Sequence, residues 1–336
     1  MVGLMHRPVP ADSGLHNVRY GYLPSNPRDS QRDTPRSPPE MTAHHPPTPV
    51  RLTAADGYTL GALHYPAAGT PTGRLVIAGA TGVPQRFYGR FAAHAARQGI
   101  DTYTLDYRGV GASRPPSLRG FRMDYLDWAR QDLAALLDHA CASGDGPVWM
   151  VGHSFGGHAF GLLPGHARVQ RLVTFGTGAG WHGWMPALEQ LRVRVLWHVV
   201  GPLLVHTRGY LAWRALGLGE DLPRDVYRQW KRWCRWPRYF FDDPDLPGMA
   251  AQFAAVRTPI AAVNAEDDRW APPASRDAFM SGYCGAPVVR VTVAPAQLGV
   301  RHIGHLNYVR PGAEALWDAT LRWLRAGGAW PMGSRG

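Results

Sequence analysis

From residue 50 onward the sequence alternates short apolar segments with amphipathic ones, and this alternation constrains the fold more than any other feature. Short apolar runs bounded by turn residues are typical of strands, whereas the intervals between them mostly have helical spacing. The predicted strands are residues 50–54, 58–65, 75–79, 101–106, 148–151, 172–175, 260–263 and 288–293. The predicted helices are residues 87–97, 125–140, 155–163, 273–281 and 313–325. This order predicts an α/β fold, a mostly parallel sheet with helices on both faces.

The segments outside this alternation define the predicted domain organisation. Residues 1–47 are rich in Pro, Arg, Ser and Asp and have little apolar periodicity, which predicts a disordered leader. Residues 180–256 hold seven of the 13 tryptophans, with apolar residues at helical spacing, and are predicted to be a helical cap. The cap divides the core into residues 48–179 and 257–328. Residues 329–336 are predicted to form a short tail.

Composition excludes several classes of protein. There are 36 basic and 25 acidic residues, a formal charge of +11, and Lys231 is the only lysine. No run of Lys and Arg is long enough for a nucleic-acid patch, so no nucleic-acid partner is predicted. The apolar run at residues 195–205 is about half the length of a membrane span, so no spanning segment is predicted. Three dispersed cysteines, Cys141, Cys234 and Cys284, suggest neither disulfides nor a zinc cluster, and a cytoplasmic location is expected.

The motif Gly152-His153-Ser154-Phe155-Gly156 joins a predicted strand to a predicted helix. It matches G-x-S-x-G, in which a nucleophilic serine sits on a tight turn. Small residues two positions before and after the serine allow the strand and helix backbones to approach. Ser154 is therefore the candidate nucleophile, and the alternative is an inert serine in a surface turn.

A serine hydroxyl becomes a good nucleophile only when a base removes its proton and an acid orients that base. Three consecutive acids follow the strand at 260–263, and among them Asp268 is preferred and Asp267 is the alternative. In the loop after the strand at 288–293, His305 is preferred as the base and His302 is the alternative.

Acyl transfer also needs two N–H donors for the oxygen that gains charge in the reaction. The backbone amide of Phe155 is the first candidate. The second is Ala80 in the small-residue loop at 78–84, with Thr81 as the neighbour that shares the role. The alternative is that this loop is only a turn. No phosphate-binding glycine motif occurs, and neither a cofactor nor a metal is predicted.

These motifs together resemble the α/β-hydrolase superfamily. The resemblance is carried by Gly-His-Ser-Phe-Gly-Gly at 152–157, Asp-Tyr-Arg-Gly-Val-Gly-Ala-Ser at 106–113, Asp268 and Gly304-His305, and it covers residues 50–328. The run Ala-Gly-Ala-Thr-Gly-Val-Pro-Gln-Arg-Phe-Tyr at 78–88 is similar to that of a group of uncharacterised bacterial serine hydrolases, although many relatives have His-Gly at its start. The resemblance implies an α/β-hydrolase fold and a structural role for the turn at 106–113.

The expected function is a serine hydrolase that cleaves a carboxylic ester or thioester through an acyl-enzyme. An acyltransferase with the same residues and a catalytically silent binding module are the alternatives. The expected partner is a small-molecule acyl substrate with an apolar acyl or alcohol group, and the sequence fixes no oligomeric state. The alternating Arg and Trp residues at 230–236 fit either an anionic lipid or acyl carrier, or a solvated face over an aromatic core.

Overall fold

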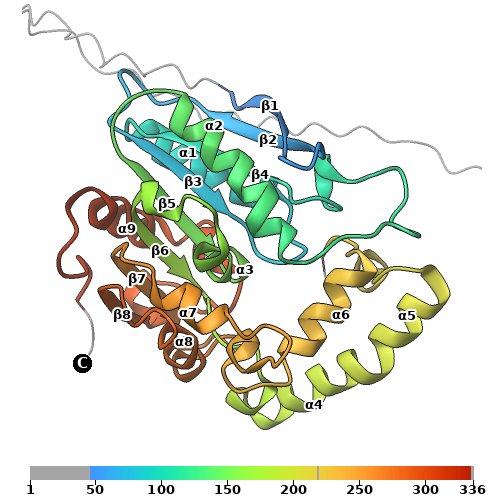
Figure 1. Ribbon diagram of the computed structural model, residues 1–336. Coiled ribbons are helices and arrows are strands. Elements are labelled where there is room, and N and C mark those ends of the chain that lie inside the picture. The colour runs from blue at the N-terminus through green and yellow to red at the C-terminus, as the bar shows by residue number, and fades with distance from the viewer. Residues whose placement is uncertain (1–45, 218, 334–336) are drawn as a thin grey trace, which may run out of the picture. The chain divides into compact units, whose positions relative to one another are not determined.

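The computed structural model describes residues 46–217 and 219–333. Its centre is an eight-stranded sheet in the order β1-β2-β4-β3-β5-β6-β7-β8 (Figure 1). The strands are β1 (Thr48–Thr53), β2 (Thr59–Tyr65), β3 (Arg74–Ala78), β4 (Asp101–Leu105), β5 (Val148–His153), β6 (Val169–Phe175), β7 (Ile260–Ala265) and β8 (Val288–Val293). Strands β1 and β2 pair antiparallel with their neighbours and the other pairs are parallel. The predicted mostly parallel α/β sheet is confirmed, while most of the predicted leader lies outside the described residues.

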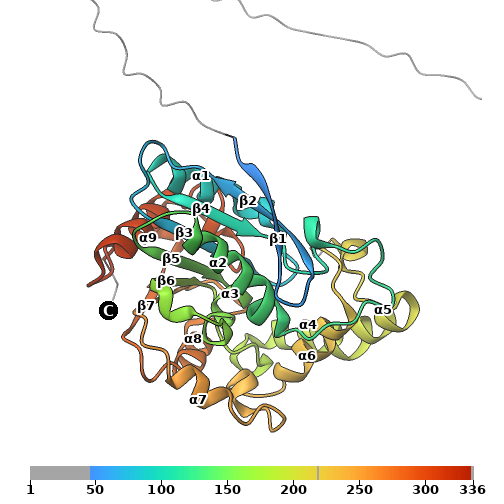
Figure 2. The ribbon, with the colours of Figure 1, turned by 45° about the horizontal axis from the view of Figure 1, so that its top comes forward.

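The helices lie on both faces of the sheet and beyond the carboxyl ends of its parallel strands (Figure 1). They are α1 (Gly89–Arg97), α2 (Ala134–Ala142), α3 (Phe155–His158), α4 (Ala187–Val195), α5 (Gly201–Arg208), α6 (Arg224–Trp233), α7 (Met249–Ala254), α8 (Pro273–Met280) and α9 (Glu314–Ala326). Figures 1 and 2 show α2 on one face and α1 and α9 on the other. Among the described residues, no helix is long and apolar enough to cross a membrane.

Two apolar cores result from the alternation of side chains along each strand. On β3, Leu75 and Ile77 pack with Phe91 of α1 and Trp317 of α9 in one core. Val76, the residue between them, belongs to the opposite core with the helix α2. A strand buried on both faces must be apolar at every position, which explains the continuous apolar runs in the sequence.

The segment between β6 and β7 forms the helices α4 to α7. Of these, α4, α5 and α6 lie beyond the carboxyl ends of the parallel strands, whereas α7 lies in front of the sheet near β7 (Figure 1). The tryptophans of this segment pack against one another. The ring of Trp230 makes edge contacts with Trp197 at 4.9 Å and with Trp213 at 5.4 Å between centroids. Trp233 stacks on Tyr125 of the core at 5.1 Å, so aromatic contacts join this segment to the sheet domain.

A buried ion pair organises the turn after β4. The Asp132 carboxylate accepts hydrogen bonds from the Arg108 backbone amide at 2.8 Å and from its Nε at 2.7 Å. Arg108 also binds Asp56 through Nη1, and its carbonyl accepts a hydrogen bond from the Trp128 indole. Burial raises the pKa of Asp132 to about 6 despite its hydrogen bonds with Arg108.

Replacing Asp132 with Ala would leave the buried Arg108 guanidinium without its buried partner. We expect the free energy of unfolding to fall by about 3 kcal/mol in urea titration. Asp138→Ala is the matched control, because Asp138 binds Arg168 on the surface, and its loss should cost under about 1 kcal/mol. Equal losses in the two variants would contradict a special role for the buried pair.

Candidate active site

Ser154 sits at the sharp bend between β5 and α3, with a φ of 51° that few residues other than glycine adopt. The backbones around it are in close contact. A Cβ on Gly152 would come within 2.6 Å of the Gly156 backbone, and a Cβ on Gly156 within 2.0 Å of the Ala78 carbonyl oxygen. Both glycines are therefore required by packing, and the bend projects the serine beyond the sheet.

Three side chains from separate loops form a continuous hydrogen-bonded path. The Oγ of Ser154 lies 3.1 Å from Nε2 of His305, and Nδ1 of His305 lies 2.9 Å from Oδ2 of Asp268. Asp268 follows β7 and His305 follows β8, so both loops leave the carboxyl ends of neighbouring parallel strands. The structure thus brings together the three residues that the sequence favoured.

Asp268 is almost completely buried. Burial alone would raise the pKa of this carboxyl, but the charge and hydrogen bond of His305 and further donors hold the pKa below its ordinary value. The donors are the backbone amides of Trp270 and Ala271, each at 2.9 Å, and the Tyr308 hydroxyl at 3.0 Å. An ionised Asp268 accepts a hydrogen bond from Nδ1–H of His305, so the unprotonated Nε2 faces the serine.

The two alternative residues pair with each other instead. His302 Nδ1 lies 2.5 Å from Asp267, and the His302 side chain is 65% exposed. Asp267 also accepts the backbone amides of Ile303 and Gly304 at 3.0 and 2.9 Å. This second acid therefore fixes the backbone of the loop that carries His305.

His153, the residue before the serine, connects the site to its surroundings. Its Nε2 lies 2.7 Å from the carbonyl oxygen of His305, and its Nδ1 lies 2.9 Å from the Tyr88 hydroxyl. Burial, together with the nearby His305, lowers the pKa of His153 to about 3, so the ring is neutral. Because a carbonyl only accepts, Nε2 carries the proton and Nδ1 accepts from Tyr88.

The sequence did not identify these supporting groups. His153 occupies an unspecified position of G-x-S-x-G, and Tyr308 belongs to no motif. Tyr88 ends the run at 78–88 that carries the family resemblance, and this was the one available signal.

The backbone amide of Ala80, the predicted second donor, already has a hydrogen-bond partner in the structure. The Ala80 amide donates to the Tyr88 hydroxyl at 2.7 Å, so this N–H is already used. Among the described residues, no acceptor is found for the amides of Thr81 and Phe155. Ala80 and Thr81 both border the cavity that contains Ser154, so the free amide distinguishes Thr81. Thr81 Oγ1 and the Tyr125 hydroxyl are 2.5 Å apart, which fixes the Thr81 side chain. Thr81 thus replaces Ala80 as the candidate donor.

A cavity of about 240 Å³ opens beside Ser154 and His305. Its walls are mainly apolar and include Trp213, Trp230 and Trp270. Two histidines, His158 and His305, line this cavity. His305 is the one whose Nε2 lies within hydrogen-bond distance of Ser154. Among the described residues, no three His, Cys, Asp or Glu side chains are grouped so that they could hold a metal ion.

Comparison with known proteins supports this assignment of the fold. A family model described as "Serine aminopeptidase, S33" matches residues 69–293. A search of curated proteins finds no match.

Solved structures are similar in fold at low sequence identity. A soluble variant of monoglyceride lipase from Saccharomyces cerevisiae has 16% identity and a TM-score of 0.60, covering 86% of this chain and 98% of that one. DcsB, solved with its substrate analogue, has 17% identity and a TM-score of 0.58, covering 84% of this chain and 100% of that one. A thermophilic esterase from Thermogutta terrifontis has 17% identity and a TM-score of 0.52, covering 83% and 98%. The predicted α/β-hydrolase fold is confirmed.

Removing the Tyr88 hydroxyl should disturb the site through His153. Tyr88→Phe leaves the Ala80 amide and His153 Nδ1 without their buried partner, so we expect stability to fall by about 1–3 kcal/mol. We expect kcat for an activated ester to fall about tenfold, because the His153 ring loses the Tyr88 bond that orients it toward the His305 carbonyl. Tyr103→Phe is the control, since it loses a hydrogen bond to Ser143 remote from Ser154. An unchanged kcat in Tyr88→Phe would contradict this linkage.

Two buried neutral histidines should make folding stability depend on pH. Burial lowers the pKa of His153 to about 3 and that of His158 to about 4, whereas an unfolded chain protonates both near pH 6.5. The unfolded state therefore binds more protons below pH 6.5. As the pH is lowered, the free energy of unfolding falls by about 1.4 kcal/mol per pH unit for each histidine. His158→Gln should reduce the slope between about pH 6 and 4.5 by that amount, while the exposed His206→Gln should not. Urea titrations at several pH values measure both slopes, and equal slopes would exclude His158 as a source.

Proposed function

Because this chain belongs to the serine aminopeptidase S33 family of α/β hydrolases, we propose that it is a serine hydrolase that cleaves a carboxylic ester or thioester. The observation that supports this function is the hydrogen-bonded path from Ser154 through His305 to Asp268 at the mouth of an apolar cavity. The path gives the serine a base, and the base a fixed orientation.

In the proposed reaction, Ser154 Oγ attacks the carbonyl carbon while His305 Nε2 takes the hydroxyl proton. The carbonyl oxygen gains the negative charge and is held by the amides of Phe155 and Thr81. When this intermediate collapses, the alcohol or thiol leaves with the proton from His305, and the acyl group stays on Ser154. Water then attacks the acyl-enzyme with His305 as base, releases the acid and restores the serine.

The apolar walls and the volume of the cavity fit an uncharged, apolar acyl or alcohol group of modest size. The family takes its name from an aminopeptidase, and an aminopeptidase must bind the ammonium group of a peptide. Within the described part of the chain, no Asp or Glu lines this cavity. An ester or thioester therefore fits the walls better than a peptide N-terminus. The monoglyceride lipase and esterase neighbours agree with this choice.

Two other functions use the same fold. An acyltransferase would pass the acyl group to an alcohol or amine faster than to water, and added acceptors would then consume the acyl-enzyme. A silent binding module would form no acyl-enzyme at all. The path from Ser154 to Asp268 favours a reactive serine over the silent module.

Labelling with a fluorophosphonate should modify Ser154, as identified by mass spectrometry of the labelled peptide, and Ser154→Ala should abolish the label. His305→Ala should lower kcat on a p-nitrophenyl acyl ester by about 10³-fold or more, because no base remains for Oγ. His302→Ala is the matched control and should change kcat only a few-fold, since His302 pairs with Asp267. Labelling at another residue, or similar losses in both histidine variants, would overturn the assignment.

A further inference from the structure

We propose that the outer faces of the helices α4, α5 and α6 form a docking surface for an anionic lipid bilayer. This proposal concerns binding and does not rest on the hydrolase function. It combines an exposed apolar stripe with an adjacent basic groove.

The apolar stripe lies on one continuous helix that runs from Ala187 to Arg208 through α4, a short π-helical turn (Leu196–Val200) and α5. Its members are spaced three or four residues apart and share one face. They are Leu188, Leu191, Val195, Val199 and Leu203, and each of these residues is 44–60% exposed. Within residues 46–217 and 219–333 only seven large apolar side chains are this exposed, and five of them are in this stripe.

The helix cannot rotate to bury the stripe, because its opposite face is fixed. Val193 and Trp197 are buried there, and the carbonyl of Trp197 accepts a hydrogen bond from the Tyr227 hydroxyl at 2.9 Å. Gly201 is so close to Tyr227 that an added Cβ would lie 2.5 Å from its ring. The exposure of the stripe is therefore built into the packing.

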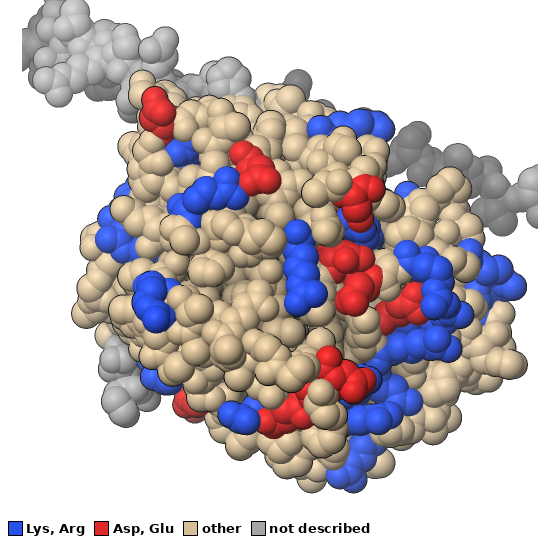
Figure 3. Space-filling view, in the orientation of Figure 1, with Lys and Arg blue, Asp and Glu red and all other residues tan. Residues whose placement is uncertain are grey.

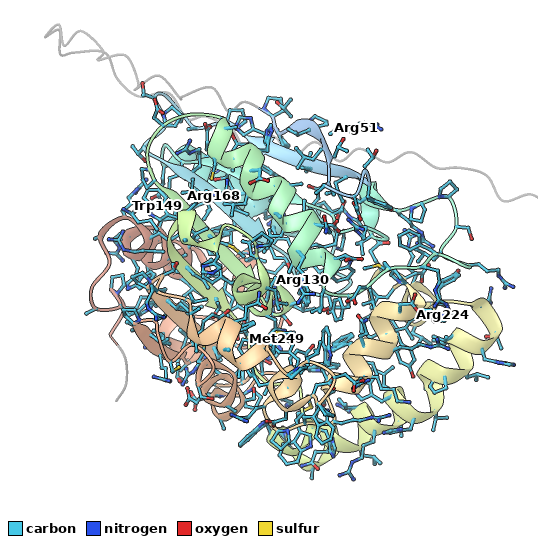
Figure 4. All side chains as sticks on the ribbon, viewed as in Figure 1. Arg51, Arg130, Trp149, Arg168, Arg224 and Met249 are labelled. Carbon is cyan, nitrogen blue, oxygen red and sulfur yellow. The ribbon has the colours of Figure 1, made fainter. Side chains whose placement is uncertain are left out.

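The basic groove runs between α5 and α6 and has a volume of about 690 Å³. On one side it is lined by Arg228 and Lys231 of α6 and by Arg235 just after this helix. Pro202 and His206 of α5 line the other side. None of these three cations has a carboxylate partner among the residues that the structure describes. Figure 3 shows basic side chains gathered over α5 and α6, and Figure 4 labels Arg224 at the start of α6.

Charge favours a lipid surface over a second copy of the chain. From 187 to 208 the only acidic residue is Glu189, which already binds Arg192 at 3.2 Å. Two copies that stacked their stripes would bring Arg192 of each copy together, with Glu189 as the only acidic residue on each helix. An anionic bilayer accepts apolar side chains and neutralises cations at the same time.

The stripe is also close to the reaction site. Leu196 belongs to the same helix and lines the cavity that contains Ser154. A bilayer docked on the stripe would therefore lie next to this cavity. In the alternating Arg and Trp segment, Trp230 and Trp233 pack inward and Lys231 and Arg235 line the groove. Arg232 pairs with Asp243 instead.

The test uses full-length Ser154→Ala, so that binding is measured without turnover, and vesicles of phosphatidylcholine with or without phosphatidylglycerol. We expect sedimentation only with the anionic vesicles, and less of it as salt is raised. The triple variant Arg228→Gln, Lys231→Gln, Arg235→Gln should weaken binding about 100-fold, since each cation near an anionic surface contributes about fivefold. The double variant Val199→Ser, Leu203→Ser should weaken it at least about tenfold.

The matched control removes the same charge elsewhere, by Arg51→Gln, Arg130→Gln and Arg322→Gln, and should retain most of the binding. Circular dichroism confirms that each variant is folded. No binding to anionic vesicles, or equal losses in the control and the groove variant, would overturn the proposal. So would a dimer in light scattering that the stripe variant dissociates, or binding of an acidic acyl carrier protein in place of vesicles. Because catalysis is absent from this assay, failure here leaves the hydrolase function untouched.

Discussion

The geometry of the site depends on the two hydrogen bonds made by the neutral imidazole of His153. Its two ring nitrogens have fixed roles, because Nε2 must donate to the His305 carbonyl and Nδ1 must accept from Tyr88. Tyr88 in turn accepts from the Ala80 amide, so one ring joins the serine bend, the loop after β3 and the loop after β8. Protonation of His153 would place a second donor against the Tyr88 hydroxyl, and burial opposes that change. A single buried ring therefore keeps three distant parts of the chain in register.

The choice of oxyanion donor shows how such a network alters a simple motif. The Ala80 amide is the expected donor by position, but it is committed to Tyr88. The next amide, that of Thr81, is placed by the bond between its hydroxyl and Tyr125. The loop begins with Ala78-Gly79, and the Tyr88 ring packs against Gly79. The hydroxyl of Tyr88 thus supplies the polar contact that orders this loop.

The sheet and the order of the site residues were predictable because strands buried on both faces must be apolar throughout, and because their carboxyl-end loops meet at one edge. Other features depend on contacts far apart in sequence. The predicted helix at 125–140 begins as a π-helix (Trp128–Leu133), which carries Asp132 and the Trp128 indole to the Arg108 turn. The predicted helix at 155–163 ends early and continues as a separate 3₁₀ turn (Phe160–Leu162). Asp267 and Asp268 are adjacent in sequence, and only the path of the backbone decides which one faces His305.

The helix from Ala187 to Arg208 must satisfy two environments at once. Its inner side contributes Trp197 to the aromatic cluster and Leu196 to the cavity wall, so this face requires apolar residues for packing. Packing gives no reason for apolar residues on the outer side, where Val199 and Leu203 remain exposed. A helix that is apolar on two faces but basic along its edges matches an interface between protein and anionic lipid better than it matches water. The same helix would then connect the bilayer, where an apolar substrate accumulates, with the cavity in which Ser154 attacks the substrate carbonyl.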